Sequence, residues 1–160
     1  MAVPERVLRL SGSYCRKDGV SEEDFHRFMS TDHAVKCAKI HEKYGILKYQ
    51  LAFNPSSTRA LANSLKLPWP TDEHDVIIEY YFKDVSSLLN ISADEDFKAL
   101  HVECEPFIRM DTTIITLTWI ELYLEDGKIV NIDSEGKSLQ PSFAEQSRIE
   151  LATKAADKYY

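Results

Sequence analysis

The chain has 160 residues, of which 44% are apolar and 28% are charged, a composition typical of one globular domain with a buried core. Its formal net charge of −7 argues against a nucleic-acid partner, because neutralising phosphates requires clustered Lys and Arg. No segment approaches the roughly 18 apolar residues of a membrane span, so no membrane partner is expected, and the N-terminus lacks the apolar run of a signal peptide.

The first predicted element is a strand over 7–15, where side chains of two kinds alternate. One face of this strand carries Leu8, Leu10, Gly12 and Tyr14. The other face carries Arg and Ser side chains, so the strand is expected to bury one side only.

The segment 21–45 is predicted to form the opening helix. Ser21 and Asp24 have the spacing of a capping box, and Gly45 suits the left-handed residue that ends a helix. Four side chains recur every four residues and line one flank: Phe25, Met29, His33 and Cys37. An ionisable imidazole among apolar neighbours on this flank is the first functional clue.

Alternating residues predict a second strand over 46–54 and a third over 75–83. A short helix between them is expected to end at the proline loop 68–70. One face of the third strand carries Ile78, Tyr80 and Phe82. The β-branched and aromatic residues of 112–124 predict a long fourth strand.

Two helices are expected between the third and fourth strands, and Ser92 with Glu95 has the capping-box pattern that would open the second. One side of that second helix carries Phe97, Leu100, His101 and Cys104. Beyond the fourth strand, Asp126–Gly127 is a hairpin-turn signal. A short strand over 128–132 and a terminal helical arm over 142–158 are predicted after it.

The predicted order is β-α-β followed by β-α-β, which is the split arrangement of a ferredoxin-like α+β fold. We assign residues 1–126 to this domain and residues 127–160 to a C-terminal extension with a short strand and a helix. Such a sheet has helices over one face only. Its open face is therefore expected to pair with a second copy, giving a homodimer.

The three cysteines, Cys15, Cys37 and Cys104, form no CxxC pair and no zinc-type spacing. We expect three reduced thiols in a cytoplasmic protein. The sequence contains no GxGxxG or GxxxxGK[ST] phosphate-binding loop, which argues against a nucleotide held in that way. No cofactor is expected.

Three stretches resemble a known family. RKDGVSEEDFHRFMSTDHA, residues 16–34, resembles the opening motif of the EthD-like branch of dimeric α+β barrel proteins. DVIIEYYFKDVSSL, residues 75–88, is similar to that family's Asp-x-x-x-Glu-x-aromatic-Phe strand, and PFIRMD, residues 106–111, is similar to its pre-strand segment. The resemblance spans 7–124 and implies a ferredoxin-like domain that dimerises.

The linker SSTRALANSLKLPWP and the C-terminal arm look like a fungal polyketide-pathway subgroup of that family. Members of the subgroup are cofactor-free lyases that decarboxylate or dehydrate fused-ring aromatic polyketides, so the resemblance implies this activity and this class of substrate. The family's recurrent helix histidine matches His33. The chain departs from the family at Met29, where a bulky aromatic is usual, and at Ala34–Val35, where Gly-Pro often follows. Both departures bear on the shape of the pocket.

If the apolar strand faces meet the helices, sheet phenols and helix imidazoles share one layer. Imidazole titrates near neutral pH and a phenol can donate to an oxyanion, so we expect His33 to be the principal acid or base and His101 its partner. The expected substrate contacts are Tyr14, Tyr49, Tyr80, His41 and Asp32. Decarboxylation and dehydration both need an acid, a base and an apolar pocket wall that excludes water. The residues do not distinguish the two reactions.

Other interpretations stay open. A histidine on an apolar helix flank, or a buried tyrosine, is often a hydrogen-bonded core residue. His33, Cys37 and His41 suggest metal ligands, but the third position drifts around the helix and no carboxylate completes the set, so no metal is expected. The rival functions are a cofactor-free monooxygenase acting on an anthrone-like phenol and a non-catalytic polyketide-binding protein.

Overall fold

The computed structural model of the protein describes residues 3–149. Its main sheet contains four strands in the order β2-β3-β1-β4, and every neighbouring pair is antiparallel. The strands are β1 (Val7–Arg16), β2 (Lys48–Phe53), β3 (Val76–Phe82) and β4 (Ile108–Ile120). This is the strand order of a ferredoxin-like fold, and the fold predicted from the sequence is confirmed.

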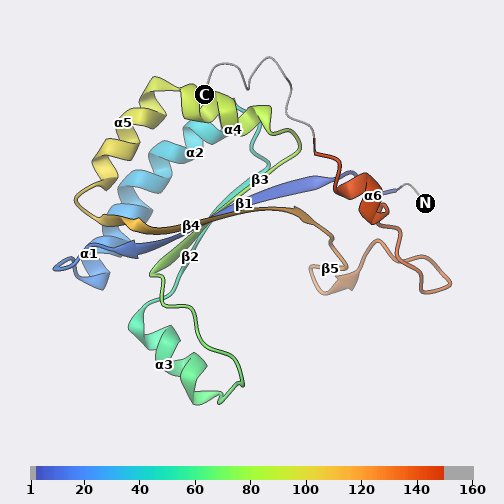
Figure 1. Cartoon of the computed structure of the whole chain (residues 1–160), viewed down its shortest axis with the longest axis horizontal. Helices are drawn as coiled ribbons and strands as arrows, with labels where there is room; N and C mark the ends of the chain where they lie inside the picture. The colour runs from blue at the N-terminus through green and yellow to red at the C-terminus, as the bar shows by residue number, and fades with distance from the viewer. Residues whose placement is uncertain (1–2, 150–160) are drawn as a thin grey trace.

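Helices cover one face of the sheet, and α3 extends from the other side (Figure 1). The helical segments are α1 (Glu22–Arg27), the π-helix η1 (Phe28–His33), α2 (Ala34–Lys43), α3 (Ser56–Ser64), α4 (Ser86–Ala93) and α5 (Glu95–Cys104). Helices α2 and α5 pack against each other above the sheet. Within residues 3–149, none of the helices combines the length and the apolarity needed to cross a membrane.

The core lies between the covered face of the sheet and these helices. Val76, Ile78 and Phe82 alternate along β3 and are almost completely buried. Leu8 of β1 pairs with Phe82, and Gly12 pairs with Ile78, so both strands contribute to the same face. The alternation predicted for the two strands is therefore confirmed.

The run α1-η1-α2 buries a side chain at every fourth position: Phe25, Met29, His33, Cys37 and His41. In an ideal α-helix each step of four residues drifts about 40° around the axis, so such a run would leave the core. Here η1 supplies a wider turn, in which the backbone N–H of Ala34 bonds to the carbonyl of Met29. The π-helical turn takes up part of the drift and keeps the flank, including His33, facing inward.

The opening helix begins as predicted, because the Ser21 hydroxyl accepts the backbone N–H of Asp24 at 3.0 Å. The predicted capping of α5 by Ser92 is wrong. Helix α4 continues past Ser92, and the carboxylate of Asp94 instead accepts two backbone N–H groups in the first turn of α5, at 3.0 and 3.2 Å. A carboxylate at the N-cap satisfies these donors better than a hydroxyl placed too early in the chain.

Strand β4 begins at Ile108, earlier than the predicted Thr112. Ile108 pairs with Arg16 of β1, beyond a β-bulge that follows Ser13. Within the segment 106–111, which was expected to precede the strand, residues 108–111 are therefore part of it. A bulge inserts an unpaired residue and shifts the alternation, which is why the polar residues there concealed the strand.

The face of the sheet away from the helices carries a polar network. Arg9 Nη1 donates to Glu79 Oε1 at 3.0 Å, and the side-chain amide of Gln50 donates to the same carboxylate. Beside this face lies a small hairpin formed by β5 (Leu124–Glu125) and β6 (Lys128–Ile129). In Figure 1 the hairpin and α3 both extend from the sheet on the side opposite to α2 and α5.

The chain beyond the hairpin returns to the start of β1. Helix α6 (Phe143–Gln146) opens with the capping box of Ser142, and Arg6 Nη1 donates to the carbonyl of Arg148 at 2.9 Å. The predicted strand 128–132 is shorter than expected. The predicted helix 142–158 starts where expected but is wrong in its length, because α6 ends at Gln146 and residues 147–149 are not helical. The part from residue 150 lies outside the described residues. The division at residue 126 stays a prediction.

Candidate active site

His33 lies at the end of the π-helical turn, with only 6% of its side chain exposed. Its Nε2 lies 3.3 Å from Sγ of Cys37, one turn further along in α2. Its Nδ1 lies 3.3 Å from Sγ of Cys104, which ends α5. The imidazole is therefore held between two helices and does not face bulk water.

Burial sets the protonation state of this group. Desolvation lowers the pKa of His33, and repulsion from His101 lowers it further. Desolvation raises the pKa of the Cys37 thiol to about 12. It raises the pKa of the Cys104 thiol to about 12 as well. At neutral pH the imidazole is uncharged and both thiols keep their protons, so one ring nitrogen remains a proton acceptor.

His41 lies further along the same flank and is 1% exposed. Its ring meets Tyr49 and Tyr80 edge to face, with ring centroids 4.6 and 4.9 Å apart. Neither imidazole nitrogen has a hydrogen-bond partner among the described residues. Desolvation, with a contribution from His33, lowers the pKa of His41 to about 4. Two unpartnered nitrogens in a buried neutral ring are a costly feature for a purely structural core.

Two phenols of the sheet lie directly beneath His41. Tyr49 of β2 and Tyr80 of β3 are register partners, and their rings stack with centroids 5.3 Å apart. The Tyr49 hydroxyl is buried without a hydrogen-bond partner among residues 3–149. Desolvation raises the pKa of both phenols. The neighbouring Cys37 thiol raises the pKa of Tyr49 further, and Tyr49 adds to the raised pKa of Tyr80. Both hydroxyls therefore remain protonated donors.

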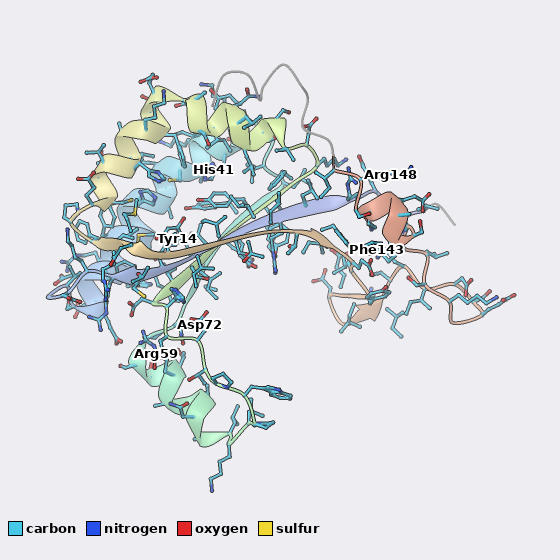
Figure 2. The ribbon with its side chains drawn as sticks, in the orientation of Figure 1. Tyr14, His41, Arg59, Asp72, Phe143 and Arg148 are labelled. Atoms are coloured by element: carbon cyan, nitrogen blue, oxygen red, sulfur yellow. The ribbon has the colours of Figure 1, made fainter. Side chains whose placement is uncertain are left out.

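Tyr14 of β1 completes the phenols of this layer. Its pKa is raised by burial and by the nearby Cys104 thiol, and it contributes in turn to the raised pKa of Tyr49 and Tyr80. Figure 2 shows His41 on the side of α2 that faces the sheet and Tyr14 on the sheet itself. The structure thus brings five of the predicted site residues into one layer between α2 and the sheet: His33, His41, Tyr14, Tyr49 and Tyr80.

His101 and Asp32 lie outside that layer. His101 is exposed on α5, and its ring packs on Phe97 with centroids 5.4 Å apart. Asp32 is exposed on the π-helical turn and forms an ion pair with Lys36, with oxygen and nitrogen 3.2 Å apart. The predicted place of His101 inside the layer is therefore corrected: His101 is exposed, although its repulsion still lowers the pKa of His33. The buried stripe of α5 is narrow and runs through Leu100 and Cys104 instead.

The chemistry available here is proton transfer in a dry layer. Neutral imidazoles can accept a proton, and protonated phenols can donate a hydrogen bond to a carbonyl oxygen or to an oxyanion. Within residues 3–149, no group of three or more His, Cys, Asp or Glu side chains is arranged to hold a metal ion, so we assign no ligands.

Sequence reasoning missed several contacts of His33. The thiol of Cys104 approaches it from the far end of α5, and Phe28 stacks on it with ring centroids 5.8 Å apart. Phe28 in turn stacks face to face on Phe107, at 3.9 Å. No signal in the sequence indicated the π-helical turn that keeps this flank facing inward.

Comparison with known proteins places this geometry in a family. A family model described as "EthD domain" matches residues 17–111. A protein of Aspergillus terreus named "Putative oxygenase" is 37% identical, over 88% of this chain and 91% of its own. "Conidial pigment biosynthesis dehydratase EthD" of Metarhizium robertsii is 28% identical, over 79% of this chain and 92% of the relative. "Decarboxylase nsrE" of Aspergillus novofumigatus is 30% identical, over 76% of this chain and 90% of the relative.

A solved structure agrees with the fold. A protein of Jannaschia sp. CCS1, described as a dimeric ferredoxin-like protein of unknown function, superposes with a TM-score of 0.51 at 9% sequence identity. The match covers 72% of this chain and 99% of that one. At this level of identity the likeness supports the ferredoxin-like architecture alone.

Proposed function

Because the chain belongs to the EthD domain family, we propose that it is a cofactor-independent lyase that decarboxylates or dehydrates an aromatic polyketide in secondary metabolism. Relatives named as dehydratases and decarboxylases support the reaction class. One observation carries the proposal. Two buried imidazoles lie in a single dry layer with the sheet phenols, and His41 has no partner for either nitrogen among the described residues.

In this proposal His33 acts as the principal acid or base, as the sequence indicated. His41 takes the partner role that was expected of His101, because it is buried and neither of its nitrogens has a hydrogen-bond partner among the described residues. The hydroxyls of Tyr49 and Tyr80 would bind keto or phenolic oxygens of the substrate. Tyr14 would contact it from β1.

Both reactions balance with these groups. In a dehydration, a neutral imidazole takes the α-proton, the C–H electrons form the new double bond, and the hydroxyl leaves as water with a proton from an acid. In a decarboxylation, CO2 leaves the substrate carboxylate, the C–C electrons form an enolate, and the α-carbon then takes a proton from an acid. A phenol hydrogen bond to the ketone oxygen stabilises the enolate-like transition state in each case, typically by a factor of about 10²–10³ per donor.

The test is turnover of a β-keto-carboxylated anthrone precursor by the purified protein, with CO2, water loss by mass spectrometry and O2 followed together. The expected result is loss of CO2 or water without O2 uptake. His41→Gln and His33→Gln should each reduce turnover by about 10²-fold or more, whereas His26→Gln, an exposed histidine of the same run, should not. Substrate binding with no product of any kind would instead identify a binding protein.

A second candidate is a cofactor-free oxygenase acting on an anthrone-like phenol. The 37% identity to a protein named as an oxygenase supports it. An oxygen electrode separates the two candidates, because an oxygenase consumes O2 in proportion to product and a lyase consumes none.

The homodimer and the cytoplasmic location are parts of the same proposal. Ile114, on the open side of β4, is 56% exposed, and the Jannaschia neighbour is described as dimeric. Ile114→Glu should shift the protein toward monomer in light scattering, whereas Val102→Glu, on α5 in the opposite layer, should not. Three free cysteines, Cys37 and Cys104 among them buried, support a reducing compartment.

A further inference from the structure

A surface depression lies over the π-helical turn, on the outer side of His33. Its volume is 380 Å³. The residues that line it are Asp24, Arg27, Phe28, Thr31, Asp32 and Phe107. They come from α1, from η1 and from the connection between α5 and β4, so the depression spans the seam between the opening helix and the start of β4.

Two aromatic rings separate this depression from the buried layer. Phe28 and Phe107 both line the depression, and they stack at 3.9 Å with their planes within 5°. On its other side Phe28 stacks on the His33 ring, at 5.8 Å and 29°. A row of three rings therefore runs from the surface to the imidazole, and Phe28 is the ring that stands between them.

The backbone that carries Phe28 is a π-helical turn between two α-helices. Phe28 is the first residue of η1 and His33 the last. π-Helical turns occur mostly as short insertions within α-helices, frequently at functional sites. Because the same turn holds both rings, a change in its winding would move Phe28 relative to His33.

The rim of the depression has a defined chemistry. The carboxylates of Asp24 and Asp32 accept hydrogen bonds, and Arg27, whose guanidinium pairs with Asp24, donates them. The Thr31 hydroxyl donates to the carbonyl of Arg27, which leaves its oxygen as an acceptor. Such a rim suits a planar ring whose phenolic hydroxyls meet carboxylates and whose keto oxygen meets Arg27.

We propose that a planar polycyclic phenol binds in this depression, stacked on Phe107, and that Phe28 is the gate through which it reaches His33. The chemical class of the guest rests on the proposed function. Phe28 and Phe107 are thus residues for access and binding, and Asp32, predicted from the sequence as a substrate contact, belongs to the rim rather than to the buried layer.

Binding is tested with a dihydroxyanthraquinone, a stable planar phenol, by isothermal titration calorimetry on the intact protein. Phe107→Ala should weaken binding by about two- to tenfold, since it removes the ring on which the anthraquinone stacks. Phe143→Ala is the matched control, because Phe143 is 75% exposed on α6, far from the layer that holds His41 and Tyr14 (Figure 2). Equal affinity in both variants would overturn the proposal.

The gate is tested without turnover, by alkylation of Cys104 with iodoacetamide and peptide mapping. Phe28→Ala should increase the alkylation rate of Cys104 several-fold, and the anthraquinone should reduce that rate in the wild type. In Phe28→Leu the side chain stays apolar and bulky, so the variant should fold, and its Cys104 should still be alkylated faster than in the wild type. Cys15, half-buried on β1, serves as the internal reference.

The two proposals fail separately. If the anthraquinone binds at Phe107 and protects Cys104 but no polyketide is turned over, the binding site stands and the lyase does not. If Cys104 labels at the same rate in the wild type, in Phe28→Leu and with the anthraquinone present, the gate is wrong whatever the turnover.

Discussion

The ring of Tyr14 folds back along β1 onto Gly12, two positions earlier on the same face of the sheet. A β-carbon at Gly12 would lie 2.5 Å from the Tyr14 hydroxyl oxygen and 2.6 Å from the nearest ring carbon. These separations are well inside contact distance, so the strand needs a residue without a side chain there. Gly12 thereby lets one phenol of the buried layer lie flat against the sheet.

Gly12→Ala should therefore destabilise the protein, although alanine in a strand normally costs less backbone entropy than glycine. Overpacking of this kind costs typically about 1–3 kcal/mol. Urea unfolding followed by circular dichroism measures the change. In a Tyr14→Ala background the same substitution should cost much less, and an equal cost in both backgrounds would show that the clash is not with Tyr14.

The buried carboxylate of Asp94 joins the start of α5 to the end of α2. It caps α5, accepts from Tyr44 at 2.7 Å and pairs with Lys43 Nζ at 2.9 Å. Asp94→Asn keeps an oxygen for the cap but loses the ion pair, whereas Asp94→Ala loses both. We expect the melting temperature to fall by several degrees in Asp94→Ala and by less in Asp94→Asn. The reverse order would contradict the capping role.

Asp94 also gives a pH dependence with a definite sign. Hydrogen bonds from Lys43 and then from Tyr44 hold the pKa of this carboxyl well below its usual range, and the charge of Lys43 adds to the shift. A carboxyl whose folded pKa is depressed stabilises the protein above the unfolded pKa, and that stability is lost as the pH falls through the folded value. The wild type should therefore lose stability below about pH 4 more steeply than Asp94→Asn.

His41 makes a second, separate contribution to the loss of folding stability at acid pH. Its pKa of about 4 in the folded protein lies below the value of 6.5 for a free imidazole, so the unfolded chain binds the additional proton. Stability should fall as the pH drops from 6.5 toward 4, by at most about 3 kcal/mol from this group. His33, whose pKa is lowered in the same direction, adds to that slope.

His41→Leu tests whether this imidazole is retained for chemistry. Leucine has no polar atoms to bury, so the variant should be at least as stable as the wild type at neutral pH and should lose much of the acid slope. Turnover should disappear at the same time. A stable His41→Leu protein with normal turnover would show that the imidazole has no part in the reaction.

His74 holds the loop before β3 to β4. Its Nδ1 lies 2.6 Å from Asp72 Oδ1 and its Nε2 lies 3.2 Å from the carbonyl of Thr112. Both partners are acceptors, so the ring satisfies them together only as an imidazolium. Accordingly the hydrogen bond to Asp72 raises the pKa of His74.

Asp72→Asn should lower the pKa of His74 toward 6.5, which an NMR titration of the imidazole protons measures. The stability that this contact adds is complete below the unfolded pKa and is lost as the pH rises through the folded one. An unchanged His74 pKa in Asp72→Asn would contradict the assigned pairing.

The sequence determined the architecture because burial follows local period. Alternation along β1 and β3, and the run of Phe25, Met29 and His33 at every fourth position, each specify which side of an element must leave water. These local patterns were enough to predict the ferredoxin-like order, the open sheet face and the inward direction of His33. Short-range spacing cannot show a β-bulge, which is why the start of β4 at Ile108 was missed.

The make-up of the buried layer was decided only by the tertiary structure. Helical spacing puts His101 on the same side as Phe97 and Cys104, yet the packing of α5 rotates His101 to the surface and brings Cys104 against His33. Whether an imidazole nitrogen such as those of His41 has a hydrogen-bond partner depends on groups that are distant in the sequence. The physical reason is that the apolar face of a helix is wider than the stripe that becomes buried. The elements packed against the helix determine which part of that face is covered.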